Sequence, residues 1–288
     1  MFNERPLPDV ESWLAVFAQS DLPVLRHSVA EIERLRANEE NTNGRVLAGV
    51  ILHDPLLSLR VLAYIEEHRR KRQTTDITTI DRAIMMIGIV PFFRTFTDLP
   101  VAETRLAEYP QALLGLLKAI GRARRAAHWA REWAILRRDM DVDEITLATL
   151  LHDVAEMMMW LYAPKMALQF RDLQVSQPNR RSAHIQEEVY GIPLNTLKLA
   201  LSEAWRLPAL VVQLLDDRQA ENPRVRNVKL AVDLARHAAK GWKDPALPDD
   251  FKAIRDLLRV NQDALLRHLN VSDEEAKLIL AMDPPPTN

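Results

Sequence analysis

The sequence predicts an all-α protein, and three observations carry that prediction. Apolar residues recur at helical spacing along nearly the whole chain of 288 residues, and no convincing alternation of period two interrupts them. Only seven residues are glycine, too few for the many tight hairpins of a β protein. Most of the 17 prolines stand where helical patterns start or stop, which is where an all-helical chain tolerates them.

The first part of the chain is predicted to hold short helices, whose starts are marked by capping residue types. Asn43 and Thr79 each precede an apolar periodic segment and can accept a hydrogen bond from the first free N–H groups of a helix. Pro55 suits the first helical position because no N–H is needed there. The expected segments are 24–35, 46–51, 55–63 and 80–87.

The rest of the chain is predicted to hold longer helices. A pattern from about 111 to 138 indicates one long helix, and Asp143 can cap a very apolar helix that runs to about 162. Further helical patterns cover 165–174, 181–190, 194–205, 208–218, 224–240, 249–268 and 272–282. The expected organisation is an N-terminal helical subdomain (1–105), a second helical subdomain (106–242) and a C-terminal helical extension (243–288).

Composition argues against several classes of protein. The chain has no cysteine, which removes disulfides, thiol nucleophiles and cysteine-ligated zinc, so a metal ion would need His and carboxylate ligands. The glycines form neither a dinucleotide-binding motif nor a P-loop. Lys and Arg number 38 against 40 Asp and Glu, which argues against a nucleic-acid or membrane partner. With no signal peptide and no bilayer-spanning apolar run, we expect a cytoplasmic protein.

His152 and Asp153 are the clearest candidates for chemistry. They lie within the apolar helix predicted over 143–162, and adjacent imidazole and carboxylate groups can be two ligands of a divalent cation. His128 lies upstream, at the margin of the apolar face of the long helix. The other interpretation is structural. The pair then belongs to a polar stripe that includes Thr149 and faces water or another helix, and His128 is a hydrogen-bonded core histidine.

Six motifs follow one another along the chain. They are Leu22-Pro23-Val24-Leu25, the segment 46–62 with His53-Asp54-Pro55, the segment 80–88, His128, Leu150-Leu151-His152-Asp153 and Trp205-Arg206-Leu207-Pro208. This ordered set resembles the bacterial HD-related output domain, HDOD, of the HD phosphohydrolase superfamily. The resemblance implies a small N-terminal helical bundle packed on an HD-like bundle at 106–242. It also implies that Asp54 caps the helix opened by Pro55.

Two departures from the HD pattern indicate a degenerate site. Active HD enzymes complete their metal site with a second aspartate on a later helix, but the usual pattern places Val232 there and not Asp233. One residue turns a helical side chain by about 100°, so Asp233 is a doubtful ligand, and a salt bridge on its own helix is the favoured interpretation. The Gly-Lys that commonly follows the His-Asp pair is Ala155-Glu156 here, which removes a cation that could hold phosphate.

The resemblance and these departures lead to one expected function and one alternative. We expect a bacterial signal-transduction module with a degenerate HD site, acting mainly through contacts with a partner protein. The alternative is a metal-dependent phosphohydrolase that acts on a nucleotide or a phosphodiester. No cofactor is expected beyond at most one divalent metal ion. Its candidate ligands are His128, His152 and Asp153, with Asp233 as the doubtful fourth.

Basic and aromatic residues on the long helix support a weaker hypothesis. Arg124 and Arg125 belong to an arginine-rich face that either binds a nucleotide or another anion, or is a solvated face paired with acidic neighbours. Trp129 and Trp133 are predicted on the outward side of that helix, which indicates a covering helix or a partner. A second basic run, from His68 to Arg72, is predicted to end a helix.

Overall fold

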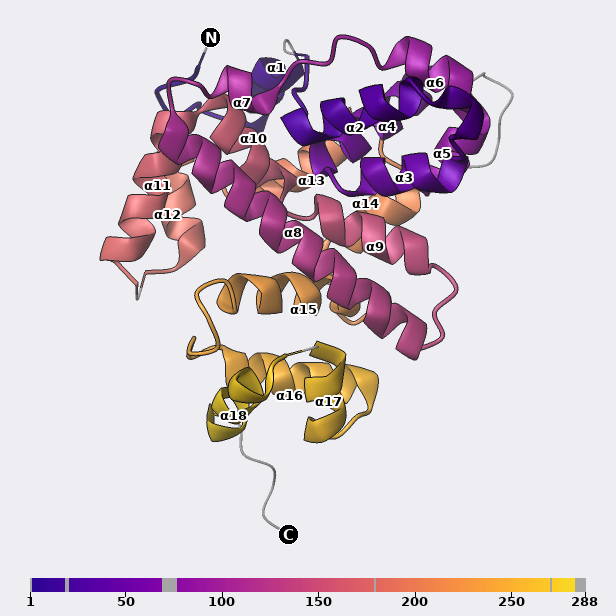
Figure 1. The fold of residues 1–288 in the computed structure, drawn as a ribbon. Helices are drawn as coiled ribbons and strands as arrows, with labels where there is room; N and C mark the ends of the chain where they lie inside the picture. Colours follow the sequence, from indigo (N-terminus) through magenta and orange to yellow (C-terminus); the bar gives the residue numbers. More distant parts are fainter. Residues whose placement is uncertain (1, 19–20, 69–76, 179, 270, 283–288) are drawn as a thin grey trace. The chain divides into compact units, whose positions relative to one another are not determined.

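A computed structural model of the chain describes residues 2–18, 21–68, 77–178, 180–269 and 271–282. This described part is α-helical with two short 3-10 helices and no β-strand, which confirms the predicted fold class (Figure 1). Of the basic run from His68 to Arg72, His68 is the last residue of α4, and the other four residues lie outside the described part of the chain. In chain order the helices are α1 (Val10–Ala18), α2 (Arg26–Arg36), η1 (Glu39–Asn41), α3 (Gly44–Leu52), α4 (Pro55–His68), α5 (Ile80–Ile87), α6 (Ile89–Thr95), α7 (Ala102–Arg105), α8 (Pro110–Leu136), α9 (Val142–Leu151), α10 (Val154–Tyr162), α11 (Pro164–Ser176), α12 (Ser182–Tyr190), α13 (Leu194–Ala204), α14 (Ala209–Leu215), η2 (Asp217–Gln219), α15 (Pro223–His237), α16 (Leu247–Leu258), α17 (Gln262–Leu269) and α18 (Asp273–Met282).

The chain forms two compact units, each built from two separate stretches of sequence. The first unit contains Met1–Gly121 and Asp153–Val212, and the second contains Arg122–His152 and Gln213–Asn288. The long helix α8 therefore contributes its first turns to one unit and its last turns to the other. The three-part domain division made from the sequence stays a prediction.

Capping residues start helices of the first unit where the sequence predicts them. The Asn43 side chain accepts a hydrogen bond from the Val46 N–H at 3.0 Å, and the Thr79 hydroxyl oxygen accepts one from the Arg82 N–H at 3.3 Å. Pro55 is the first residue of α4. These three helix starts are confirmed, because each depends on one local residue type and not on distant contacts.

Asp54 lies at the junction of α3 and α4 and is fully buried. Its Oδ1 accepts hydrogen bonds from the N–H groups of Leu56 and Leu57 at 2.9 and 3.3 Å, so the predicted cap of α4 is confirmed. Its Oδ2 accepts from the N–H of Leu25 and the hydroxyl of Ser28, both at 2.8 Å. Burial raises the pKa of Asp54, and the four hydrogen bonds oppose that rise. One carboxylate thus joins the N-terminal ends of α2 and α4.

The buried apolar residues of α3 and α4 form part of the core of the first unit. Their inward faces are buried, and the two helices are bent by 119° where they meet. Among the described residues no single helix is long and apolar enough to cross a bilayer, and α3 and α4 pass that test only when taken together.

The sequence patterns do not predict three short helices, α1, α6 and α7. Helix α6 follows directly after Gly88, whose φ of 83° is readily adopted only by glycine. Near its end, the Arg36 guanidinium donates hydrogen bonds to the carbonyl oxygens of Phe93 and Phe96 at 2.9 and 3.1 Å. A side chain from α2 therefore satisfies the free carbonyls of α6, and no local pattern shows this.

Helix α10 lies in the core of the first unit, where every residue of it except Glu156 is buried. Helices α1, α11 and α13 pack against it. Trp13 of α1 is fully buried, and its indole N–H donates a hydrogen bond to the Tyr190 carbonyl oxygen at 3.0 Å. Trp160 of α10 packs against α8 at Gly115, where the backbone and the indole ring approach closely.

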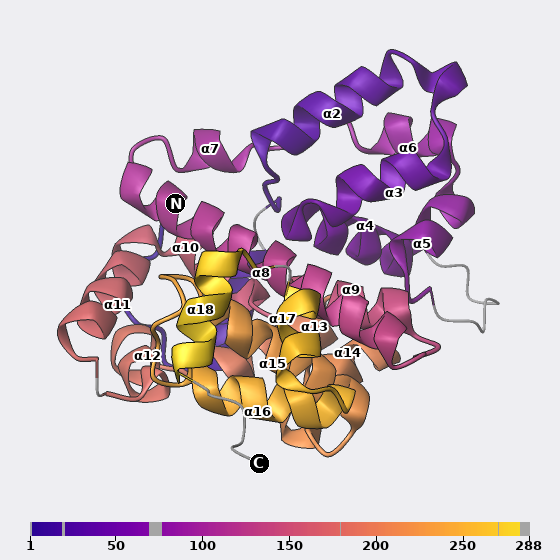
Figure 2. The same cartoon turned by 60° about the horizontal axis from the view of Figure 1, so that its bottom comes forward.

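The second unit packs α15 against α9 and α16, and α17 against α16 (Figure 2). The single helix predicted over 249–268 is two helices, because Arg259 takes the left-handed conformation with φ of 55°. Trp129 and Trp133 are 4% and 0% exposed. Neither indole is exposed, and of the two expected explanations the cover by another segment of the chain is confirmed for Trp129. Trp242, which precedes α16, lies with its ring centroid 6.3 Å from that of Trp129, so a C-terminal segment covers this part of α8.

A histidine–aspartate pair joins α15 to α16 and should make the stability of the second unit depend on pH. His237 Nδ1 lies 2.6 Å from an Asp250 carboxylate oxygen. The hydrogen bond to Asp250 raises the pKa of His237 above 6.5, burial opposes the rise, and the charges of Asp250, Asp233 and Asp244 add to it. Since the folded pKa lies above the unfolded value, the stabilisation is complete below about pH 6.5 and is lost as pH rises through the folded pKa.

We therefore expect His237→Gln to lower the urea-denaturation midpoint more at pH 6 than at pH 8. His184 is exposed on α12, so His184→Gln is the matched control and should show no such difference. Equal losses at the two pH values for His237→Gln would contradict the assigned ion pair.

Candidate functional site

The His152-Asp153 pair lies at a break between two helices. The sequence predicts one helix over 143–162, but α9 ends at Leu151 and α10 begins at Val154, so that prediction was wrong. The His152 N–H donates to the Thr149 carbonyl at 3.3 Å, in a tighter pattern than an α-helix has. The break interrupts the expected polar stripe, and the Thr149 hydroxyl donates to the Ile145 carbonyl of its own helix at 2.7 Å.

His152 pairs with an aspartate that the sequence did not identify. Its side chain is 8% exposed, and Nε2 lies 3.0 and 3.3 Å from the two carboxylate oxygens of Asp217. Both residues belong to the second unit. These distances fit a hydrogen bond between the imidazole and the carboxylate, which becomes an ion pair when the ring is protonated.

The turn that carries Asp217 is held in place by its neighbour Asp216. The Asp216 carboxylate accepts hydrogen bonds from the Arg218 backbone N–H at 3.2 Å and from its guanidinium at 2.7 and 3.0 Å. A further bond comes from the Gln219 side chain at 3.1 Å. The hydrogen bonds from Arg218 hold the pKa of Asp216 at about 2. The 3-10 helix η2 is therefore ordered by Asp216, which leaves Asp217 to face His152.

The remaining candidate ligands lie in other environments. His128 is exposed on α8, and Asp153 is half-buried at the start of α10. Asp233 forms ion pairs within α15, with Lys229 at 2.5 Å and Arg236 at 3.4 Å. Within the described ranges, no three His, Cys, Asp or Glu side chains form a group that could hold a metal ion. A metal site at His128, His152, Asp153 and Asp233 therefore stays a prediction from the sequence.

The two arginines predicted to bind an anion lie on the part of α8 that belongs to the second unit. Arg124 is half-buried and Arg125 is exposed. The charge of Arg125 helps to lower the pKa of Glu275, although hydrogen bonds from Ser272 and Trp242 contribute more. Arg125 thus faces an acidic residue of α18.

A model of the HDOD domain matches residues 22–220, which span the His152-Asp153 pair and the Asp217 turn. The described part of the chain is helical, and the His152-Asp153 pair at the junction of α9 and α10 lies within the matched residues, which places the chain among HD-related output domains. The chain belongs to the HDOD family. A search of curated proteins gave no significant match.

Two solved structures show the same fold at low sequence identity. The MmoQ response regulator from Methylococcus capsulatus is 19% identical with a TM-score of 0.57, over 90% of this chain and 98% of its own. A virulence factor from Campylobacter jejuni is 16% identical with a TM-score of 0.62, over 96% of this chain and 97% of its own. At these identities the likeness establishes the fold.

Proposed function

We propose that this chain is a bacterial, cytoplasmic signal-transduction module that acts mainly through contacts with a partner protein and has a degenerate HD site. The observation that carries the proposal is the hydrogen bond between His152 Nε2 and Asp217. In a metal-dependent phosphohydrolase the histidine must be neutral and direct a lone pair at the cation. Here that nitrogen lies 3.0 Å from an Asp217 carboxylate oxygen, so a cation would have to replace this contact.

The other expected ligands support the same conclusion. Asp233 is engaged by two cations of its own helix, and a carboxylate paired in this way loses those contacts before it binds a metal. The residues after the His-Asp pair, Ala155 and Glu156, offer no positive charge to a phosphate group. Belonging to the HDOD family and sharing a fold with a response regulator both favour a signalling role.

The test measures metal content and phosphodiester hydrolysis of the full chain. Protein purified in the presence of Mn²⁺ is analysed for bound metal and assayed with bis(p-nitrophenyl) phosphate. We expect less than stoichiometric metal and a rate equal to that of His152→Ala. Stoichiometric metal together with turnover, both lost in folded His152→Ala, would overturn the proposal and favour the phosphohydrolase.

A second experiment addresses the partner directly. The chain is cross-linked in its source cells, and the captured proteins are compared between the wild type and His152→Ala. We expect the same signalling protein in both samples, because the proposed contacts do not require chemistry at His152. Loss of that partner in His152→Ala, with the fold intact, would contradict action through protein contacts independent of the site.

A further inference from the structure

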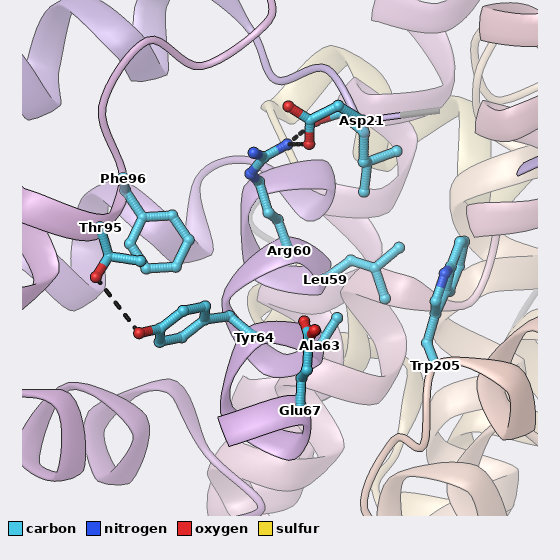
Figure 3. Close-up of a pocket in the computed structure, with 10 residues that line it drawn as sticks. Asp21, Leu59, Arg60, Ala63, Tyr64, Glu67, Thr95, Phe96 and Trp205 are labelled. Carbon is cyan, nitrogen blue, oxygen red and sulfur yellow. Dashed lines mark hydrogen bonds and ion pairs between the residues drawn. The ribbon is translucent and has the colours of Figure 1, made fainter. Parts of the chain in front are cut away.

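The first unit contains a cavity of about 380 Å³ that is separate from His152. It is lined by α4, the segment before α2, the end of α6 and the residue that follows α13, and all of these belong to one unit. Figure 3 shows Tyr64 and Phe96 on one side and Trp205 on the other, with Leu59 between them. The volume falls in the range of pockets that bind small molecules or single side chains, about 300–1,000 Å³.

The charges of this cavity favour a cation. Arg60 is its only basic lining residue among those described, and its guanidinium is bound to the Asp21 carboxylate at 2.6 Å and to the Leu22 carbonyl at 2.7 Å. The remaining charge is Glu67, which is exposed and has no ion pair within the described part of the chain. Among the described lining residues, one cation and two carboxylates give a net negative charge, which disfavours an anionic ligand.

The Trp205 indole suits a planar cation, whereas the ring of Tyr64 is stacked on that of His68, with centroids 4.0 Å apart. Tyr64 packs edge-on against Phe96, with ring centroids 5.4 Å apart, and its hydroxyl lies 3.4 Å from the Thr95 hydroxyl. Trp205 is half-buried in the facing wall. Arginine stacks its guanidinium on tryptophan and tyrosine faces and forms ion pairs with carboxylates.

We propose that this cavity binds an arginine side chain from a basic segment of the partner protein. The aliphatic part of that side chain would lie against Leu59 and Ala63, and its guanidinium would reach Glu67 and the indole of Trp205. Tyr64 and Ala63 precede Glu67 by three and four positions on α4, so the three residues share one helix face. The proposal rests on the proposed function, because it names the chemistry of the partner contact.

The test uses N-acetyl-arginine methylamide as the probe and the full chain as the receptor. Binding is followed by the NMR shift of the Trp205 indole N–H, assigned with Trp205→Phe. We expect saturable binding that Glu67→Gln weakens about threefold or more. Glu11→Gln, which changes an exposed carboxylate of α1, should bind the probe as the wild type does.

The neutral isostere N-acetyl-citrulline methylamide should give no saturable shift. Equal binding of the citrulline probe, unchanged binding by Glu67→Gln, or saturable binding of inorganic phosphate at this indole would overturn the arginine site. The Mn²⁺ assay distinguishes the two proposals. Turnover would overturn the signalling function, whereas absent arginine binding without turnover would overturn only the cavity assignment.

Discussion

Asp54→Ala is expected to lower the free energy of unfolding by about 3–5 kcal/mol. The substitution removes both acceptor oxygens from a fully buried position and leaves the N–H groups of Leu25, Leu56 and Leu57 and the Ser28 hydroxyl without their partner. Each buried donor left unsatisfied costs about 1–3 kcal/mol, and partial entry of water reduces the sum. The measurement is the urea-denaturation midpoint followed by circular dichroism.

Two variants separate this effect from general loss of charge. Asp54→Asn keeps one acceptor oxygen but places an NH₂ group against donors, so it should also destabilise, by less than Asp54→Ala. Asp172 is 67% exposed on α11, and Asp172→Ala should change stability by no more than about 0.5 kcal/mol. If Asp54→Ala matches Asp172→Ala, the carboxylate does not join α2 to α4 as described.

Much of the fold could be predicted because its signals are local. Asn43, Asp54 and Thr79 each bind N–H groups two or three residues later, so the residue type alone marks the start of a helix. The ordered motifs from Leu22 to Pro208 were also sufficient to predict the HDOD family, which the match over 22–220 confirms. Helix α6 could not be predicted, because its last carbonyl groups accept hydrogen bonds from Arg36, a residue of α2.

The partner of His152 could not be predicted because it lies 65 positions away. Positions 152 and 153 hold neither Gly nor Pro, the residue types that usually mark a helix break. The helical pattern of apolar residues continues across both positions. The adjacent Asp216 and Asp217 were visible as an acidic pair after the apolar α14. Which carboxylate would bind Arg218 and which would face His152 depends on the η2 turn.

The burial of Trp129 also could not be predicted from the sequence, because it depends on which elements cover that face of α8. A helical projection distinguishes the faces of α8 but cannot say how many of them other elements cover. The contact of Trp129 with Trp242 comes from a segment more than a hundred residues later in the chain. The indole N–H of Trp242 in turn donates to Glu275 of α18 at 2.9 Å, so the cover depends on tertiary contacts alone.

Gly115→Ala is the second substitution with a large expected effect. A Cβ atom at this position would lie 2.6–2.7 Å from three ring carbons of Trp160, closer than real Cβ contacts come. Trp160 is 5% exposed, and its indole N–H donates to Glu156 at 3.2 Å, so the ring cannot move away freely. We expect the free energy of unfolding to fall by about 1–3 kcal/mol, the usual cost of overpacking a core.

Gly121 of the same helix provides a control variant, for which the expected change in the free energy of unfolding has the opposite sign. A methyl group added at Gly121 of α8 would meet no atom of another element within 4 Å, so Gly121→Ala should stabilise the chain by about 0.5–1 kcal/mol through helix propensity. Combining Gly115→Ala with Trp160→Phe should recover part of the loss, because the smaller ring leaves room for the methyl group. If Gly115→Ala stabilises as Gly121→Ala does, or if Trp160→Phe gives no recovery, then the close approach of α8 to Trp160 is not a determinant of stability. Since helix propensity favours alanine equally at both glycines, the difference between the two variants measures the packing against Trp160 alone.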